Sequence, residues 1–169
     1  MYFNGFCLEN EEELFEEYII ENDYTLSGFS YGAIKALEFA LGSCAMDIRI
    51  DLVQLFSPSF FNDKNEKYKR MQLMYFKKDK QKYCDNFLKN SGFNKLQSLK
   101  YFKEGTYEEL NELLNYKWDQ NKLQLLIENG TKIEVYLGED DKIIDSHKAL
   151  EFFINFSEVY FIKNKGHIL

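Results

Sequence analysis

A five-residue stretch, Gly28-Phe29-Ser30-Tyr31-Gly32, constrains the fold of this chain more than any other feature. The apolar run before it, residues 24–27, is typical of a strand, and residues 31–41 have the apolar spacing of a helix. Glycine has no Cβ, so the two glycines allow strand and helix to meet in a turn too sharp for larger side chains. The pattern predicts Ser30 at the tip of a strained strand-to-helix turn, followed by a helix that ends at Gly42.

Other apolar segments predict further strands that alternate with helices. Residues 52–56 and 159–162 are nearly continuous apolar runs, and 133–137 alternate and are β-branched. With residues 24–27 and the short apolar start, they predict a small, mostly parallel α/β sheet of about five strands. Three capping residues mark expected helix starts, namely Asn10, Thr106 and Asp145.

The length and composition indicate one domain with a basic insert. The chain has 169 residues and 45% are hydrophobic, enough for a single core over residues 1–169. Residues 62–105 differ in character, being rich in lysine and asparagine with aromatic residues and leucines at helical spacing, which predicts a helical insert. Residues 62–103 hold eleven lysines and one arginine against four acids, which gives this segment a net charge of +8. Since the whole chain has a net charge of −7, the rest of the chain carries −15.

Cysteine usage and hydropathy exclude several classes of protein. Cys7, Cys44 and Cys84 are odd in number and widely spaced, which argues against a disulfide framework or a structural zinc site. Cys7 is expected to be a small packed side chain. The chain shows neither an apolar run long enough to span a bilayer nor the shape of a signal peptide, so we expect a cytoplasmic protein with no membrane partner.

Three chemically suggestive residues follow three different predicted strands, namely Ser30, Asp141 and His167. Loops at the carboxyl ends of parallel strands meet in one crevice, so we expect these side chains to lie together. A serine hydroxyl needs a base to become a nucleophile, imidazole suits that role near neutral pH, and a carboxylate orients the imidazole. The set predicts a Ser-Asp-His catalytic triad that uses no metal or cofactor.

Neighbouring residues offer alternatives for the acid and the base. Asp140 is adjacent to Asp141, and Asp145 lies four residues further on, but the Gly138-x-x-Asp141 spacing favours Asp141. Asp145 is better placed to cap the following helix. The second histidine, His147, is expected to be solvated.

Backbone amides should stabilise the oxyanion of the tetrahedral intermediate. One donor is the residue after the nucleophile, Tyr31, and the other lies in the loop after the first strand, where Phe6 is the expected donor.

Motifs spread from residue 4 to residue 167 resemble the α/β-hydrolases, with the order nucleophile, acid, base. More specifically, the elbow 26–37, the segment 55–61 and the ending Lys165-Gly166-His167 are similar to the compact pimeloyl-acyl-carrier-protein methyl ester esterases of the BioV type. The resemblance implies a compact α/β-hydrolase fold with a helical cap and hydrolysis of that methyl ester, with release of methanol, in biotin synthesis. One departure is Asn4-Gly5, where most α/β-hydrolases have His-Gly.

The resemblance suggests a binding partner for the basic insert. It could dock an acidic acyl carrier protein, bind nucleic acid, or only be a solvated surface. The acidic overall charge and the lack of a recognition motif argue against nucleic acid, so we expect an acyl carrier protein bearing a pimeloyl methyl ester, bound by a monomer. The expected docking residues are Lys64, Lys67, Lys69, Arg70, Lys77 and Lys78.

Two other functions remain open from the sequence. One is a broader short-chain carboxylesterase or thioesterase, and the other is a non-catalytic binding protein of the same fold.

Overall fold

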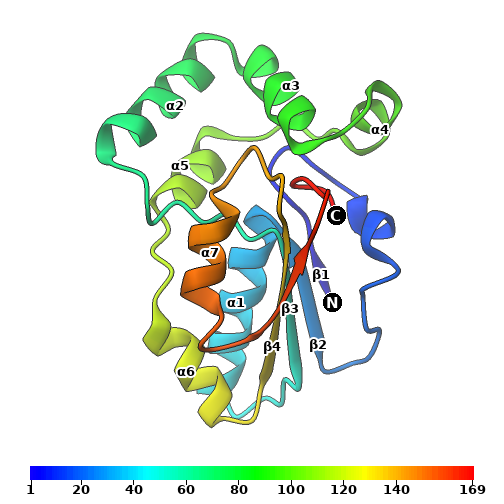
Figure 1. Cartoon of the computed structure of the whole chain (residues 1–169), viewed down its shortest axis with the longest axis vertical. Helices are drawn as coiled ribbons and strands as arrows, with labels where there is room; N and C mark the ends of the chain where they lie inside the picture. The colour runs from blue at the N-terminus through cyan, green and yellow to red at the C-terminus, as the bar shows by residue number, and fades with distance from the viewer.

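The computed structural model describes all residues, 1–169, and contains one five-stranded sheet. The strand order is β1-β2-β3-β4-β5, and every neighbouring pair is parallel, which confirms the predicted sheet. All five strands therefore end at the same edge (Figure 1). The strands are β1 Tyr2–Phe3, β2 Thr25–Phe29, β3 Leu52–Phe56, β4 Lys132–Gly138 and β5 Glu158–Ile162.

The two faces of the sheet have different covers. Helices α1 (Tyr31–Ala45), α6 (Gln120–Glu128) and α7 (Ser146–Phe153) pack on one face, over apolar strand residues such as Val53 and Val135. The segment between β1 and β2, which contains the short 3₁₀ helix η1 (Glu11–Phe15), covers the other face. Phe15 anchors this segment, because its ring lies 4.9 Å from that of Phe29 and 4.9 Å from that of Phe56.

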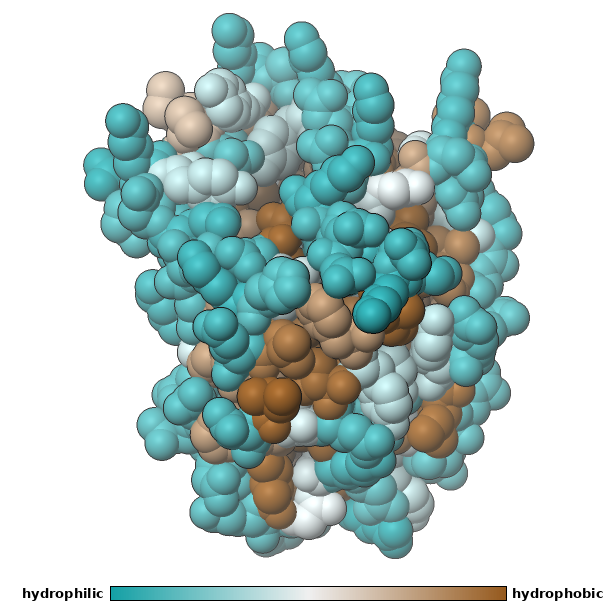
Figure 2. All heavy atoms as spheres, in the orientation of Figure 1, coloured by the Kyte–Doolittle hydropathy of each residue, from teal (hydrophilic) through white to brown (hydrophobic).

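A helical cap lies across the carboxyl ends of the strands (Figure 1). It consists of α2 (Glu66–Lys78), α3 (Lys80–Ser91) and α4 (Lys95–Tyr101), and α5 (Tyr107–Asn115) joins it to the body by packing against α2 and α1. Side-chain caps at Asn65, Asp79, Asn94 and Thr106 start these four helices. The upper, cap end of the molecule is mostly hydrophilic in Figure 2.

The residues after β5 run beneath the cap. Ile168 donates its amide to the carbonyl of Ser91 on α3 at 3.1 Å. Leu169 is buried in a cluster with Leu88 and Phe93. The loop that carries His167 is thus attached to α3 at its far end.

Two helix boundaries differ from the sequence-based expectation. Helix α1 continues through Gly42 to Ala45, and Gly42 does not adopt the left-handed conformation of a helix-ending glycine. Asn10 does not cap a helix; it adopts a left-handed conformation with φ 56°, and η1 begins with the side chain of Glu11 buried. None of the helices has the length and apolar character needed to cross a membrane.

Candidate active site

The turn at Ser30 is as sharp as the glycine pattern requires. Ser30 has φ 54° and ψ −109°, a strained conformation for a residue with a side chain. A methyl group on Gly28 would overlap the backbone oxygen of Gly32, and one on Gly32 would overlap that of Phe3. Both glycines are therefore needed for the close approach of α1 to β2 and β1.

The structure brings Ser30, His167 and Asp141 into one hydrogen-bonded chain. Ser30 Oγ lies 2.9 Å from His167 Nε2, and His167 Nδ1 lies 2.7 Å from Asp141 Oδ2. The side chains of His167 and Asp141 are fully shielded from solvent, and Ser30 is 1% exposed. With Nδ1 protonated and bonded to the carboxylate, Nε2 is free to accept the proton of the serine hydroxyl.

The loop after β4 holds Asp141 rigidly. The second carboxylate oxygen of Asp141, Oδ1, accepts hydrogen bonds from the backbone amides of Ile143 at 2.7 Å and Ile144 at 3.2 Å. The alternative acid Asp140 is exposed and is not part of this chain of contacts, and Asp145 caps α7 by accepting the amide of Lys148 at 3.1 Å, as expected. His147 is exposed, which confirms that it is solvated.

The two expected oxyanion donors have free amides. Neither the Phe6 amide nor that of Tyr31, the first residue of α1, makes a hydrogen bond within the protein. The preceding amide, that of Gly5, is used: it donates to Glu11 Oε1 at 2.6 Å. Burial raises the pKa of the Glu11 carboxyl to about 7.

Ser59 is a contact of Ser30 that was not predicted from the sequence. Its Oγ lies 3.1 Å from Ser30 Oγ, and its amide donates to the Ser30 carbonyl at 3.1 Å. Because the Ser30 proton is directed to His167, the Ser59 hydroxyl is the donor of the first bond. Trp118 fixes the segment by donating Nε1–H to the Ser59 carbonyl at 2.9 Å. The signal in the sequence was its position, directly after the apolar run of β3.

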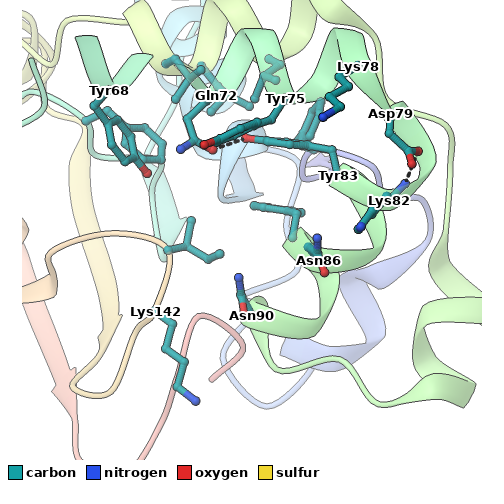
Figure 3. Close-up of a pocket in the computed structure, with 17 residues that line it drawn as sticks. Tyr68, Gln72, Tyr75, Lys78, Asp79, Lys82, Tyr83, Asn86, Asn90 and Lys142 are labelled. Carbon is teal, nitrogen blue, oxygen red and sulfur yellow. Dashed lines mark hydrogen bonds between the residues drawn. The ribbon is translucent and has the colours of Figure 1, made fainter. Parts of the chain in front are cut away.

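A cavity of about 560 Å³ lies under the cap; its lining includes neighbours of His167 and Asp141 but not Ser30, Asp141 or His167 themselves. Its inner lining includes Phe6, Phe87, whose ring faces His167 at 6.3 Å, and Ile143, which is bonded to Asp141. Polar side chains of the cap line the opposite part, and Figure 3 shows Gln72, Asn86 and Asn90 directed toward the space opposite Lys142. The cavity thus combines an apolar inner wall with a polar and basic outer one. The remaining lining residues are Phe61, Tyr68, Tyr75, Lys78, Asp79, Lys82, Tyr83, Leu110, Leu113 and Leu114.

The six expected docking residues are not equally accessible. Lys67, Arg70, Lys77 and Lys78 are exposed on α2, with the exposed Met74 between them. Lys64 is half-buried and pairs with Asp63 at 2.6 Å.

Lys69 corrects the expectation, because it is only 1% exposed and does not present its charge to a partner. Its ammonium has no hydrogen-bond partner, and burial, followed by repulsion from Lys117, lowers its pKa. Because Lys69 faces inward, the number of lysines in α2 overstates the positive charge on the outer face of the helix.

Cys7 is a packed side chain, as expected, and its neighbour is a second cysteine. Cys7 Sγ lies 2.7 Å from Cys84 Sγ of α3, and both residues are buried. This contact joins the loop after Phe6 to the cap.

The comparisons with known proteins identify the fold. No family model and no curated protein sequence matches the chain. Among solved structures, BioG from Haemophilus influenzae is similar over 99% of this chain and 87% of its own, with 13% identity and a TM-score of 0.62. A carboxylesterase from Nitrososphaera gargenis matches 85% of this chain (16% identity, TM-score 0.57), and naproxen esterase from Bacillus subtilis matches 92% (20% identity, TM-score 0.53).

The chain therefore has a compact α/β-hydrolase fold. It spans 57% of the length of each of these two esterases.

Proposed function

We propose that the protein is a serine esterase that hydrolyses the methyl ester of a pimeloyl group carried on an acyl carrier protein. The observation that supports the enzymatic part is the buried chain of contacts from Ser30 through His167 to Asp141, next to a cavity large enough for an acyl chain.

The proposed reaction begins with Ser30. Its Oγ attacks the ester carbonyl while His167 Nε2 takes the hydroxyl proton, and Asp141 holds the imidazole and stabilises its positive charge. The amides of Phe6 and Tyr31 donate to the oxyanion of the tetrahedral intermediate. Collapse of the intermediate breaks the bond to the methoxy oxygen, which leaves as methanol with the proton from His167.

The second half of the reaction restores the enzyme. Water loses a proton to His167 Nε2 and attacks the acyl-enzyme carbonyl. The bond to Ser30 Oγ then breaks, the serine regains its proton from His167, and the free carboxylic acid leaves. These steps use side chains, backbone amides and water.

The choice of substrate rests on the resemblance to the BioV-type esterases and on charge. The exposed basic residues of α2, including Lys67 and Arg70, belong to a segment with a net charge of +8 beside the cavity. An acidic carrier protein would be attracted to this surface while the acyl chain enters the apolar part of the cavity.

A fluorophosphonate probe tests the enzymatic part. We expect the folded protein to be labelled at Ser30 and the Ser30→Ala variant to remain unlabelled, as measured by intact mass and peptide mapping. A wild-type protein that is folded, judged by circular dichroism, but takes no label would contradict the proposal and favour a binding protein.

A comparison of substrates tests the specificity. Pimeloyl methyl ester on acyl carrier protein should be hydrolysed with a kcat/KM at least about tenfold higher than the free dimethyl ester, and this advantage should shrink as salt rises. Equal rates that do not respond to salt would instead support a broader carboxylesterase, and preferential cleavage of the thioester link would support a thioesterase.

A further inference from the structure

Glu11 is a buried carboxylate behind the loop that supplies the Phe6 amide. It is 0% exposed, its Oε1 accepts the Gly5 amide at 2.6 Å, and the Tyr2 hydroxyl donates to the same oxygen at 3.4 Å. Its second oxygen has no hydrogen-bond partner, and no lysine or arginine forms an ion pair with it. Burying a carboxylate without a cation costs free energy, so a role limited to packing does not explain the residue.

The local backbone directs Glu11 toward this loop. Asn10 has φ 56°, and this left-handed turn starts η1 with the Glu11 side chain facing the end of β1. The other end of η1 is fixed by Phe15, which packs between the rings of Phe29 and Phe56. The carboxylate is therefore attached to a rigid support on the side of the sheet away from α1 (Figure 1).

The hydrogen bond to Glu11 determines which amide of the loop is free. The Gly5 N–H is directed to the carboxylate, while the next amide, that of Phe6, makes no hydrogen bond within the protein. Since successive peptide planes share a Cα, fixing the Gly5 amide restricts the orientation of the Phe6 amide. The side chain of Asn4, the residue before Gly5, is exposed and makes no hydrogen bond that would hold this loop in place.

We infer that Glu11 is a positioning residue that aims the Phe6 amide at the oxyanion by holding the amide of Gly5. Glu11 does not touch the substrate. Its effect is confined to the transition state, where the oxyanion exists, and this inference rests on the proposed ester hydrolysis.

Three substitutions separate positioning from packing. Glu11→Leu removes the acceptor, Glu11→Asp withdraws it by one methylene but keeps the charge, and Glu11→Gln keeps an acceptor of the same reach without the charge. Glu12→Leu, at the exposed neighbouring position, is the matched control. The measurements are kcat and KM on a free p-nitrophenyl ester and the affinity for a trifluoromethyl ketone that forms an oxyanion on Ser30.

We expect Glu11→Leu and Glu11→Asp to lower kcat about 10- to 100-fold with KM changed less than about twofold, and to weaken ketone binding by a similar factor. Glu11→Gln should recover kcat to within about threefold of wild type, and Glu12→Leu should match wild type.

A folded Glu11→Leu variant with wild-type kcat and ketone affinity would overturn the inference, and so would a Gln variant as impaired as the Leu variant. If Glu11→Leu does not fold, Glu11→Asp decides: wild-type kcat in that variant overturns the inference. A wild-type protein that hydrolyses no ester would overturn the proposed function as well, whereas an active wild type with an unaffected Leu variant would overturn only the role of Glu11.

Discussion

The loops of the body and the outer face of the cap hold their functional groups in opposite ways. In the body, His167 and Asp141 are shielded from solvent, and each makes contacts of 2.7–3.2 Å that leave little freedom. On the cap, Lys67 and Arg70 extend into water without an ion-pair partner. Under the proposed function, the chemistry would depend on a few fixed positions in the body, whereas recognition of a carrier would depend on a field of charge on the cap that tolerates movement.

The strongest test of this comparison substitutes the two adjacent aspartates of the loop after β4. Asp141→Asn should lower kcat about 10⁴-fold, because the amide can no longer hold the protonated Nδ1 of His167, while Asp140→Asn should change it less than about twofold. Steady-state rates on a free ester, with the mass of the variants confirmed, measure both. Loss of activity in the Asp140 variant alone would mean that Asp140, and not Asp141, is the carboxylate that orients His167.

A smaller effect is expected from the charge buried in the body. The pKa of Glu11 is raised from its ordinary 4.5 to about 7. Between these values the native state keeps the proton and the unfolded chain releases it, so native stability falls as pH rises through this window. Glu11→Gln should therefore gain up to about 3 kcal/mol in free energy of unfolding relative to wild type between pH 4 and pH 8.

Urea denaturation at several pH values measures this difference. Glu12→Gln at the exposed neighbouring position should show no such gain with pH. If the difference in free energy of unfolding between Glu11→Gln and wild type did not change with pH, burial would not raise the pKa of the Glu11 carboxyl.

The smallest effect is expected on the cap. Arg70→Glu should lower kcat/KM for the carrier-borne ester about three- to tenfold at low salt and leave the free ester unchanged, because only docking is affected. Lys163→Glu, an equally exposed reversal on the body, is the control. The effect of Arg70→Glu should fade at high salt. An equal loss of kcat/KM on the carrier-borne ester and the free ester would show that Arg70 affects ester hydrolysis and not only docking of the carrier.

The sequence was sufficient for features that depend on local pattern. The strands have strong apolar runs. The turn around Ser30 could be predicted from Gly28 and Gly32, because only a close approach of helix and strand requires glycine at both positions. Because Ser30, Asp141 and His167 follow strands of one parallel sheet, their meeting could be expected from topology alone.

Features that depend on distant contacts could not be predicted in this way. Asn10 and Glu11 have the pattern of a helix start, but in the structure this segment is only a short 3₁₀ helix, with Glu11 bonded to the distant Gly5 amide. Lys69 belongs to a lysine-rich helix, and only the folded structure, in which α2 packs against α3 and α5, shows that it is buried. The cavity is lined by three helices, α2, α3 and α5, and by the loops after β1, β3 and β4, and no local pattern could have identified its walls.

The attachment of the His167 loop to α3 has a consequence for substrate entry. Ile168 is hydrogen-bonded to Ser91, the ring of Phe87 faces the imidazole, and Cys84 touches the loop after Phe6. A movement that lifts α3 would pull the His167 imidazole and the loop around Phe6 away from Ser30. If the protein hydrolyses esters as proposed, we therefore expect the cap to stay in place during turnover and the acyl chain to enter the cavity lengthwise. We expect such an entrance to favour slender, flexible chains over bulky, rigid esters.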